Sequence, residues 1–253
     1  ELMPYMNVYL LSVLLVMVLL FFSVSFLCKG AKKGTMEVIG FRPESNMEYV
    51  WGTTFGFLLV FGGIGLVCLL GGCFIHLLWG QAPFMIGYYL FYYFSLFIPA
   101  LLCWLGISFC VTLLSRERGS CVFFLLVLYF VSILYMANCR WGVFDILGIE
   151  LPNMFSQATG HSNLKLYLLQ RGCWMLLGIG LLQSAVLLFG RIPNNPVKAG
   201  RGIIACLFLG CGCFLGVLFY QENQDVDTKR QVYAEIYAKF DALPKVTIIS
   251  HDI

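Results

Sequence analysis

Residues 49–115 read YVWGTTFGFLLVFGGIGLVCLLGGCFIHLLWGQAPFMIGYYLFYYFSLFIPALLCWLGISFCVTLLS and contain no Asp, Glu, Lys or Arg. A helix needs about 20 mostly apolar residues to cross a membrane, so this stretch is too long for a single span. The segment 79–83, Trp-Gly-Gln-Ala-Pro, is its natural break, because Gly and Pro favour turns and Trp favours the membrane interface. The stretch therefore predicts two membrane-spanning helices, at about 55–79 and 84–114.

Four further apolar stretches are long enough to span a membrane, at about residues 7–28, 121–138, 173–190 and 202–220. A charge at the centre of the bilayer costs roughly 2.5–3.5 kcal/mol. None of the six predicted spans contains a charged residue. We therefore expect an all-α, polytopic membrane protein whose transmembrane domain, a bundle of about six helices, occupies residues 1–221.

The composition of the whole chain agrees with this fold class. Of the 253 residues, 60% are hydrophobic and 11% are charged, and the mean hydropathy is +0.86. An ordinary soluble domain is about one quarter charged. The composition excludes a soluble globular enzyme, a disordered protein and a nucleic-acid-binding protein.

The distribution of positive charge predicts the orientation in the membrane. Loops 29–48, 115–120 and 191–201 would lie on one side, and they hold Lys29, Lys32, Lys33, Arg42, Arg116, Arg118, Arg191, Lys198 and Arg201. The opposite side has an uncharged hairpin and the loop 139–171, whose Lys and Arg residues are Arg140, Lys165 and Arg171. By the positive-inside rule the first three loops face the cytoplasm. The apolar loop 139–171 predicts either short helices in the outer interface or a loop folded over the helix ends.

The C-terminal part, residues 222–253, differs in composition from the spans. Val232, Ile236 and Phe240 form one stripe of an amphipathic helix, which Leu243-Pro244 would end. Residues 246–249, Val-Thr-Ile-Ile, are typical of a β-strand. We expect an extracytoplasmic helix that leads into a truncated soluble domain, in a piece of a longer protein that lacks at least one upstream span.

Catalytic and metal-binding motifs are absent from the sequence. There is no Gly-x-x-x-x-Gly-Lys-Ser/Thr loop and no His-Glu-x-x-His, and the histidines are scattered on unrelated segments. The spacing of Cys211-Gly-Cys213 does not fit a redox pair or a zinc site. We expect no catalytic residue, no metal and no cofactor in this chain.

Small residues and cysteines lead to two structural expectations, a close helix contact and a disulfide. Gly212-xxx-Gly216 follows the small-xxx-small pattern and predicts close helix packing. Cys139 and Cys173 flank the outer loop, and a disulfide between them is possible if the loop faces an oxidising compartment.

The first cytoplasmic loop has the most distinctive local sequence, GTMEVIGFRPESNMEYVWG at residues 34–52. Ser45-x-x-Glu48 predicts a capping box that begins the second span. The apolar side chains of Met36, Val38, Ile39 and Phe41 are suited to a short interfacial helix. From the residues alone, the simpler interpretation, the entry loop of a helix, is favoured over a functional one.

This loop resembles the cytoplasmic loop of ABC-2 type permeases, which in that family forms the coupling helix that docks on the ATPase. The matching positions are Gly34, Thr35, Glu37, Arg42, Pro43, Ser45, Asn46, Tyr49, Gly52 and Gly56. Thr53 stands where the family usually has a basic residue. Residues 233–244, followed by a strand, are similar to the junction in bacterial permeases fused to an M1-family aminopeptidase.

The resemblance implies site residues. The ATPase-coupling residues would be Thr35, Met36, Glu37, Val38, Ile39, Phe41, Arg42, Pro43, Ser45, Asn46 and Glu48. Gly52 and Gly56 would pack helices together, as would Gly212 and Gly216.

The resemblance also implies a function: a membrane-spanning permease subunit that couples ATP hydrolysis by a separate ATPase to substrate export. Its place would be the bacterial inner (cytoplasmic) membrane. Its partners would be an ABC ATPase subunit, a second permease half or an identical copy, and membrane lipids, with no nucleic acid. Alternatives are a non-transporting anchor that presents an extracytoplasmic, peptidase-like domain and, disfavoured by the uncharged spans, a secondary carrier.

Overall fold

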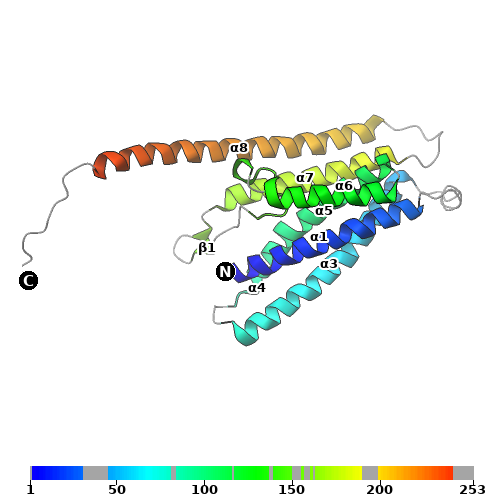
Figure 1. Ribbon diagram of the computed structural model, residues 1–253, viewed down its shortest axis with the longest axis horizontal. Coiled ribbons are helices and arrows are strands. Elements are labelled where there is room, and N and C mark those ends of the chain that lie inside the picture. The colour runs from blue at the N-terminus through cyan, green and yellow to red at the C-terminus, as the bar shows by residue number, and fades with distance from the viewer. Residues whose placement is uncertain are drawn as a thin grey trace, which may run out of the picture.

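The computed structural model describes residues 2–30, 45–80, 84–115, 117–136, 139–149, 155–156, 160–161, 163–189 and 199–241. Six helical segments in this part of the chain are long and apolar enough to cross a membrane: Met3–Cys28, Asn46–Trp79, Ile86–Ser115, Arg118–Met136, Leu164–Leu188 and Gly200–Phe240. The chain is a multi-pass helical membrane protein, as its sequence predicts (Figure 1).

The segments are built from seven α-helices and two π-helical turns. The α-helices are α1 (Leu2–Gly30), α3 (Asn46–Trp79), α4 (Ile86–Tyr92), α5 (Ile98–Ser115), α6 (Arg118–Val131), α7 (Leu164–Leu188) and α8 (Ala199–Asp241). The π-helical turns are η1 (Tyr93–Phe97) and η2 (Ser132–Met136). Between η2 and α7 lie a 3₁₀ turn, η3 (Arg140–Gly142), and an antiparallel pair of two-residue strands, β1 (Phe155–Ser156) and β2 (Gly160–His161).

A proline explains why the third span is interrupted. Pro99 is the second residue of α5, where it lacks the N–H that would bond to the carbonyl of Ser95. The wider π-helical turn η1 comes directly before it and accommodates this missing bond. The span therefore runs as α4, η1 and α5 rather than as one regular helix.

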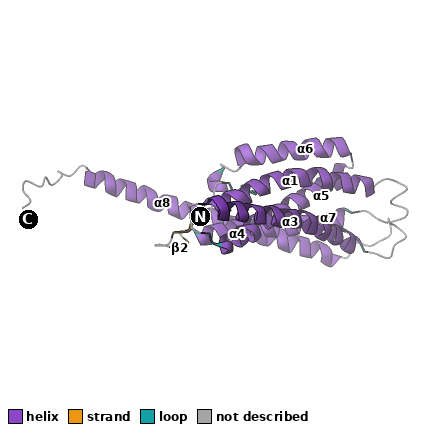
Figure 2. Cartoon of the chain, turned by 90° about the horizontal axis from the view of Figure 1, so that it is seen from below, coloured by secondary structure: helices purple, strands orange, loops and turns teal. Residues whose placement is uncertain are grey.

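The helices lie side by side, and their ends form two groups (Figures 1 and 2). The last turns of α1, α5 and α7 gather with the first turns of α3, α6 and α8, and we call this the basic end, because the three Lys/Arg-rich loops join helices there. Arg118 of α6 donates to Ser25 Oγ of α1 at this end, at 2.8 Å. Residues 139–149 lie at the opposite end, which we call the loop end.

α5 lies at the centre of the bundle and packs mainly on α7 and α1. Trp104, Leu105 and Phe109 of α5 are fully buried. Two glycines bring α5 and α7 together: a Cβ on Gly178 would lie 2.7 Å from the backbone nitrogen of Cys103, and one on Gly106 would lie 2.9 Å from the carbonyl oxygen of Gly178. The two backbones are in direct contact at this crossing.

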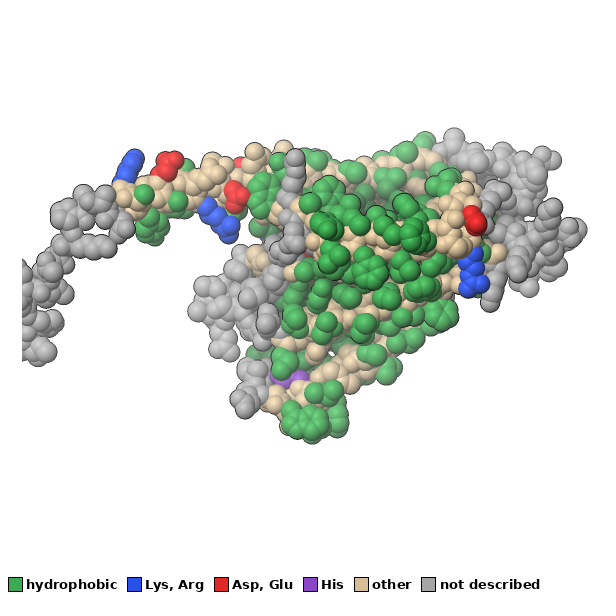
Figure 3. Space-filling model, in the orientation of Figure 1, with side chains coloured by type: hydrophobic (Ala, Val, Ile, Leu, Met, Phe, Trp, Pro, Cys, Tyr) green, Lys and Arg blue, Asp and Glu red, His purple; other side chains and the backbone are tan. Residues whose placement is uncertain are grey.

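Apolar side chains cover the membrane-facing surface. In Figure 3 they fill the face in view, and charged side chains appear at the basic end and along the far half of α8. This pattern is the one expected of a bundle surrounded by lipid.

α8 differs from the predicted short span followed by a separate helix. It is one continuous helix of 43 residues, about 65 Å long at 1.5 Å per residue. A hydrocarbon core of about 30 Å accommodates less than half of this length. The polar half of α8 therefore projects beyond the other helices at the loop end (Figure 2), with Val232, Ile236 and Phe240 exposed. The expected strand at 246–249 lies outside the described residues.

The possible disulfide between Cys139 and Cys173 is not formed. Both cysteines are free. Cys139 is exposed in the loop, whereas Cys173 is buried within α7 and faces α8, where a Cβ on Gly216 would lie 3.3 Å from its sulfur. The fifth span begins at Leu164 rather than at Cys173, so Cys173 lies inside a helix and not at the edge of the loop.

The α5–α7 crossing generates a stability prediction. Gly178→Ala places a methyl group against backbone that cannot rotate away, so we expect a loss of about 1–3 kcal/mol of unfolding free energy. Thermal unfolding of the detergent-purified protein would measure it. Gly71→Ala is the matched control, because no described atom lies within 4 Å of that position. Equal unfolding temperatures for the two variants would contradict the close crossing.

Candidate functional site

The start of α3 is fixed by the predicted capping box. Ser45 N donates to Glu48 Oε2 at 2.6 Å, and Glu48 N donates to Ser45 Oγ at 3.2 Å. These two bonds satisfy backbone groups that a helix otherwise leaves without partners at its first turn. The loop that resembles a coupling helix therefore joins a well-defined helix end.

Residues in the last part of the 34–52 sequence, where α3 begins, contact the end of α7. Asn46 Nδ2 donates to the carbonyl oxygen of Phe189 at 2.6 Å, and the ring of Tyr49 stacks on the ring of Phe189 with centroids 4.8 Å apart. One turn further along α3, Trp51 Nε1 donates to Gln183 Oε1 at 3.1 Å. We call these contacts the α3–α7 junction. They link the first turn of α3 to the last turns of α7 through both polar and ring contacts.

The other end of α7 holds the loop at residues 139–149. Arg171 is 2% exposed and donates through Nη2 to the carbonyl oxygen of Asp145 at 2.6 Å and through Nη1 to that of Ile146 at 3.0 Å. Nη2 also donates to Gln170 Oε1 at 2.7 Å, and Gln170 Nε2 donates to the carbonyl oxygen of Gly142. Two adjacent side chains of α7 thus satisfy three loop carbonyls. We call this group of bonds the Arg171 clamp.

α1 also contributes to holding the loop. Tyr5 Oη donates to the carbonyl oxygens of Gly148 and Ile149, the second at 3.2 Å. Gly148 N donates to Asp145 Oδ1 at 2.7 Å, which closes the turn. Gly148 has a φ of 79°, and a Cβ there would lie 2.4 Å from Leu96, so glycine is required at this position.

The clamp solves an electrostatic problem as well as a structural one. Burying an unpaired charge or an unbonded carbonyl is costly in a medium without water. The guanidinium group offers a fork of donors, which suits several acceptors at once. The loop carbonyls and the guanidinium group therefore stabilise each other at the loop end of the bundle.

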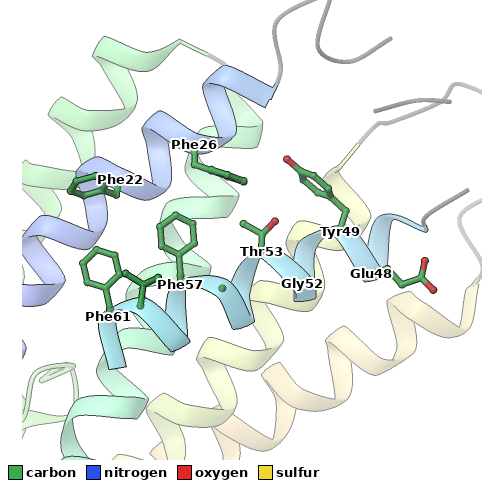
Figure 4. Close-up of a pocket in the computed structure, with 10 residues that line it drawn as sticks. Phe22, Phe26, Glu48, Tyr49, Gly52, Thr53, Phe57 and Phe61 are labelled. Atoms are coloured by element: carbon green, nitrogen blue, oxygen red, sulfur yellow. The ribbon is translucent and has the colours of Figure 1, made fainter. Parts of the chain in front are cut away.

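A groove runs along α3 at the basic end, between α3 and α1 (Figure 4). Its volume is about 750 Å³, and it is lined by Phe22, Phe26, Glu48, Tyr49, Gly52, Thr53, Gly56, Phe57, Val60 and Phe61. Ring contacts pair the two helices along it: Phe22 with Phe61 at 6.2 Å and Phe26 with Phe57 at 5.9 Å between centroids. Half of these lining residues are aromatic.

Some of the predicted site residues lie in the described part of the chain and others lie outside it. Thr35, Met36, Glu37, Val38, Ile39, Phe41, Arg42 and Pro43 lie outside the described residues. Ser45, Asn46 and Glu48 lie at the start of α3, where Ser45 and Glu48 form the cap and Asn46 forms part of the α3–α7 junction.

The four glycines expected to pack helices divide into two pairs. A Cβ on Gly212 would lie 2.8 Å from Leu177, so Gly212 belongs to the α7–α8 contact together with Gly216. The expectation that Gly52 and Gly56 pack helices together is corrected for the described part of the chain, because no described atom lies within 4 Å of a Cβ at either position. They line the groove instead, since α1 approaches α3 through its phenylalanine rings and not through the α3 backbone.

Sequence reasoning did not find the Arg171 clamp. Placing the fifth span at residues 173–190 assigned Arg171 to a loop, although α7 begins at Leu164 and buries it. The available signal was Gln170-Arg171 within a run rich in Leu, together with Asp145 in an otherwise apolar loop. A buried ionisable residue in a span is by default a candidate functional group.

Comparison of the chain with protein-family models, curated proteins and solved structures gave no match. Any assignment of function therefore depends on the residues and geometry above.

Arg171→Met tests the clamp. The substitution retains an apolar stem and removes three hydrogen bonds, each worth about 1–3 kcal/mol when one partner is charged, so the loop should open more often. We expect hydrogen exchange at the Gly148 amide to accelerate about 10- to 100-fold. The control is Lys165→Met, which removes an exposed ion pair to Glu222 and should leave that exchange rate unchanged. Unchanged exchange in Arg171→Met would show that the clamp does not hold the loop.

Proposed function

We propose that this chain is the membrane-spanning permease subunit of an ATP-driven, ABC-2 type transporter that exports its substrate. A separate ATPase would bind the loop at residues 34–48 on the cytoplasmic side, and the helix bundle would supply the path together with a second permease half or an identical copy. The bacterial inner membrane is the location that this assignment implies.

The observation that carries the proposal is that α7 is held at both ends. At the basic end, the α3–α7 junction ties α7 to the last residues of the motif-bearing sequence 34–52, which form the first turns of α3. At the loop end, the Arg171 clamp ties α7 to the loop that folds over the bundle. α7 has 25 residues and is about 37 Å long, so it connects the two ends as one rigid element. A push on the loop would therefore reach the far end of the bundle.

Two features of the chain support a separate ATPase as the source of energy: the missing P-loop and the roles of its buried ionisable residues. The sequence contains no P-loop, so hydrolysis would take place in another subunit. Arg171 and Asp145 are ionisable and buried, but the hydrogen bonds described above hold the loop together: Arg171 donates to loop carbonyls and Asp145 accepts from Gly148 N. They therefore do not strengthen the secondary-carrier alternative.

α8 favours a second candidate function, a membrane anchor for an extracytoplasmic domain. Its polar half continues the membrane-spanning helix at the loop end and leaves a broad apolar face exposed, including Val232, Tyr233 and Ile236. A helix of this kind suits a rigid support for a following domain. The two functions are compatible in one protein, but only the first needs an ATPase.

Reconstitution with a P-loop ATPase encoded beside this chain tests the proposal. We expect the two proteins to co-purify and the permease to stimulate ATP hydrolysis. Ile39→Asp combined with Phe41→Asp adds charge to a surface that needs apolar burial, so stimulation should fall about tenfold. Phe240→Asp, at the other end of the molecule, is the control and should leave stimulation unchanged. Absence of both co-purification and stimulation would contradict the proposed function.

A second variant separates docking from transmission. Asn46→Ala removes the hydrogen bond to Phe189, worth about 1 kcal/mol, and should lower stimulation about fivefold while the ATPase still co-purifies. Wild-type stimulation in this variant would show that the α3–α7 junction does not transmit the movement.

A further inference from the structure

The groove between α1 and α3 has a gradient of polarity along its length. Its first turns, next to the basic end, present the hydroxyl groups of Tyr49 and Thr53 on the side of α3 that faces Phe26 (Figure 4). Further along, the lining consists of carbon alone, from Phe57, Val60 and Phe61. A ligand that fits this surface has a polar end at the membrane interface and an apolar end directed into the bilayer.

The length of the groove matches one leaflet. From Tyr49 to Phe61 the helix rises about 18 Å. Half of a hydrocarbon core of about 30 Å is about 15 Å. Both walls belong to membrane-spanning segments, and Phe22, Phe26 and Val60 are between 48% and 59% exposed, so the groove opens sideways to the bilayer.

The room in the groove is created by two glycines. No described atom lies within 4 Å of a Cβ built on Gly52 or Gly56. On the side of the same helix that faces η1, such positions are filled: a Cβ on Gly65 would lie 2.6 Å from Phe97, and Tyr93 Oη lies 3.3 Å from one on Gly62. The glycines that face η1 are used in packing, whereas Gly52 and Gly56 leave space next to the phenylalanine rings of the groove.

The sequence that follows the α1 wall favours a negative head group. Lys29, Lys32 and Lys33 come directly after the apolar stretch of α1 along the chain. Among the described lining residues Glu48 is the one carboxylate; it accepts a hydrogen bond from Ser45 N and is directed away from Phe26 in Figure 4. Lys and Arg next to a membrane span attract anionic lipids.

From these observations we propose that the α1–α3 groove is a binding site for one acyl chain of an anionic phospholipid from the leaflet at the basic end. The chain lies along Gly52 and Gly56 between the phenylalanine rings, and the phosphate lies at the level of Tyr49. This site does not depend on the proposed transport function, because a lipid bound here is held whether or not the protein moves a substrate.

Photocrosslinking in nanodiscs tests the site. The probe is phosphatidylglycerol with a diazirine near the middle of one acyl chain, present as a minor component in phosphatidylcholine. Adducts mapped by mass spectrometry should concentrate at residues 22–26 and 52–61. The same diazirine chain on phosphatidylcholine should give several-fold less adduct, and equal labelling by the two probes would contradict the anionic assignment.

Two leucine substitutions give a matched pair. Gly56→Leu adds a side chain to the groove at a position where no described atom lies within 4 Å of the Cβ, and it displaces about two methylene contacts, so adducts at these residues should fall about tenfold. Gly63→Leu adds the same side chain to an exposed position on the same helix that does not line the groove, and labelling should stay at the wild-type level.

Two results would overturn the proposal. Adducts spread evenly over the lipid-facing helices, unaffected by Gly56→Leu, would mean that the groove holds only bulk lipid. A wild-type dimer that Gly56→Leu converts to a monomer, with no chain adducts at 52–61, would mean that a helix of a second copy occupies the groove through its small residues.

Discussion

A guanidinium group bonded to backbone carbonyls inside the membrane part of the protein is the interaction on which the loop end depends. Arg171 could not be buried without acceptors, and the loop carbonyls of Asp145 and Ile146 could not be buried without donors. The guanidinium group supplies the donors that the carbonyls need, and the carbonyls supply the acceptors that the guanidinium group needs. The loop is held by hydrogen bonds from α7 and α1 together with burial of Ile146 and Leu147, so its position is tied to the positions of those two helices.

α7 is suited to connect the two ends of the bundle because it packs closely on two neighbouring helices. It packs directly on α5 through Gly178 and on α8 through Gly180, against which Leu209 of α8 lies. Backbone contacts of this kind allow little sliding of one helix past another, because any displacement creates overlap. Movement imposed at the α3–α7 junction would consequently be passed on by α7 as a rigid body, and the first place where it changes hydrogen bonding is the Arg171 clamp.

Hydrophobicity and local capping rules were sufficient to predict the number of spans and the start of α3. The absence of charge over residues 49–115 indicates buried or lipid-facing helices regardless of tertiary structure, and the Ser45–Glu48 box depends on four consecutive residues only. The start of α7 was not predictable in the same way. Arg171 is tolerated inside a span only because carbonyl groups 25 and 26 residues earlier in the chain return to accept its hydrogen bonds. The sequence of α7 alone does not indicate that contact.

The same distinction applies to the candidate site. Gly212 and Gly52 occur in the same small-residue pattern, yet one packs against Leu177 and the other faces a groove, because the outcome depends on which helix lies opposite. The contacts of Asn46 and Tyr49 with Phe189 are also long-range, and no periodicity in the sequence indicates them.

The most direct test of α7 as the connecting element is hydrogen exchange at residues 145–149 in a complex with the proposed ATPase, with and without ATP. If α7 transmits movement between the two ends, ATP should change the exchange rate of the Gly148 amide in the wild-type complex, and Asn46→Ala should abolish most of that change while the ATPase remains bound. An exchange rate at Gly148 that is the same with and without ATP in the wild-type complex would contradict transmission through α7.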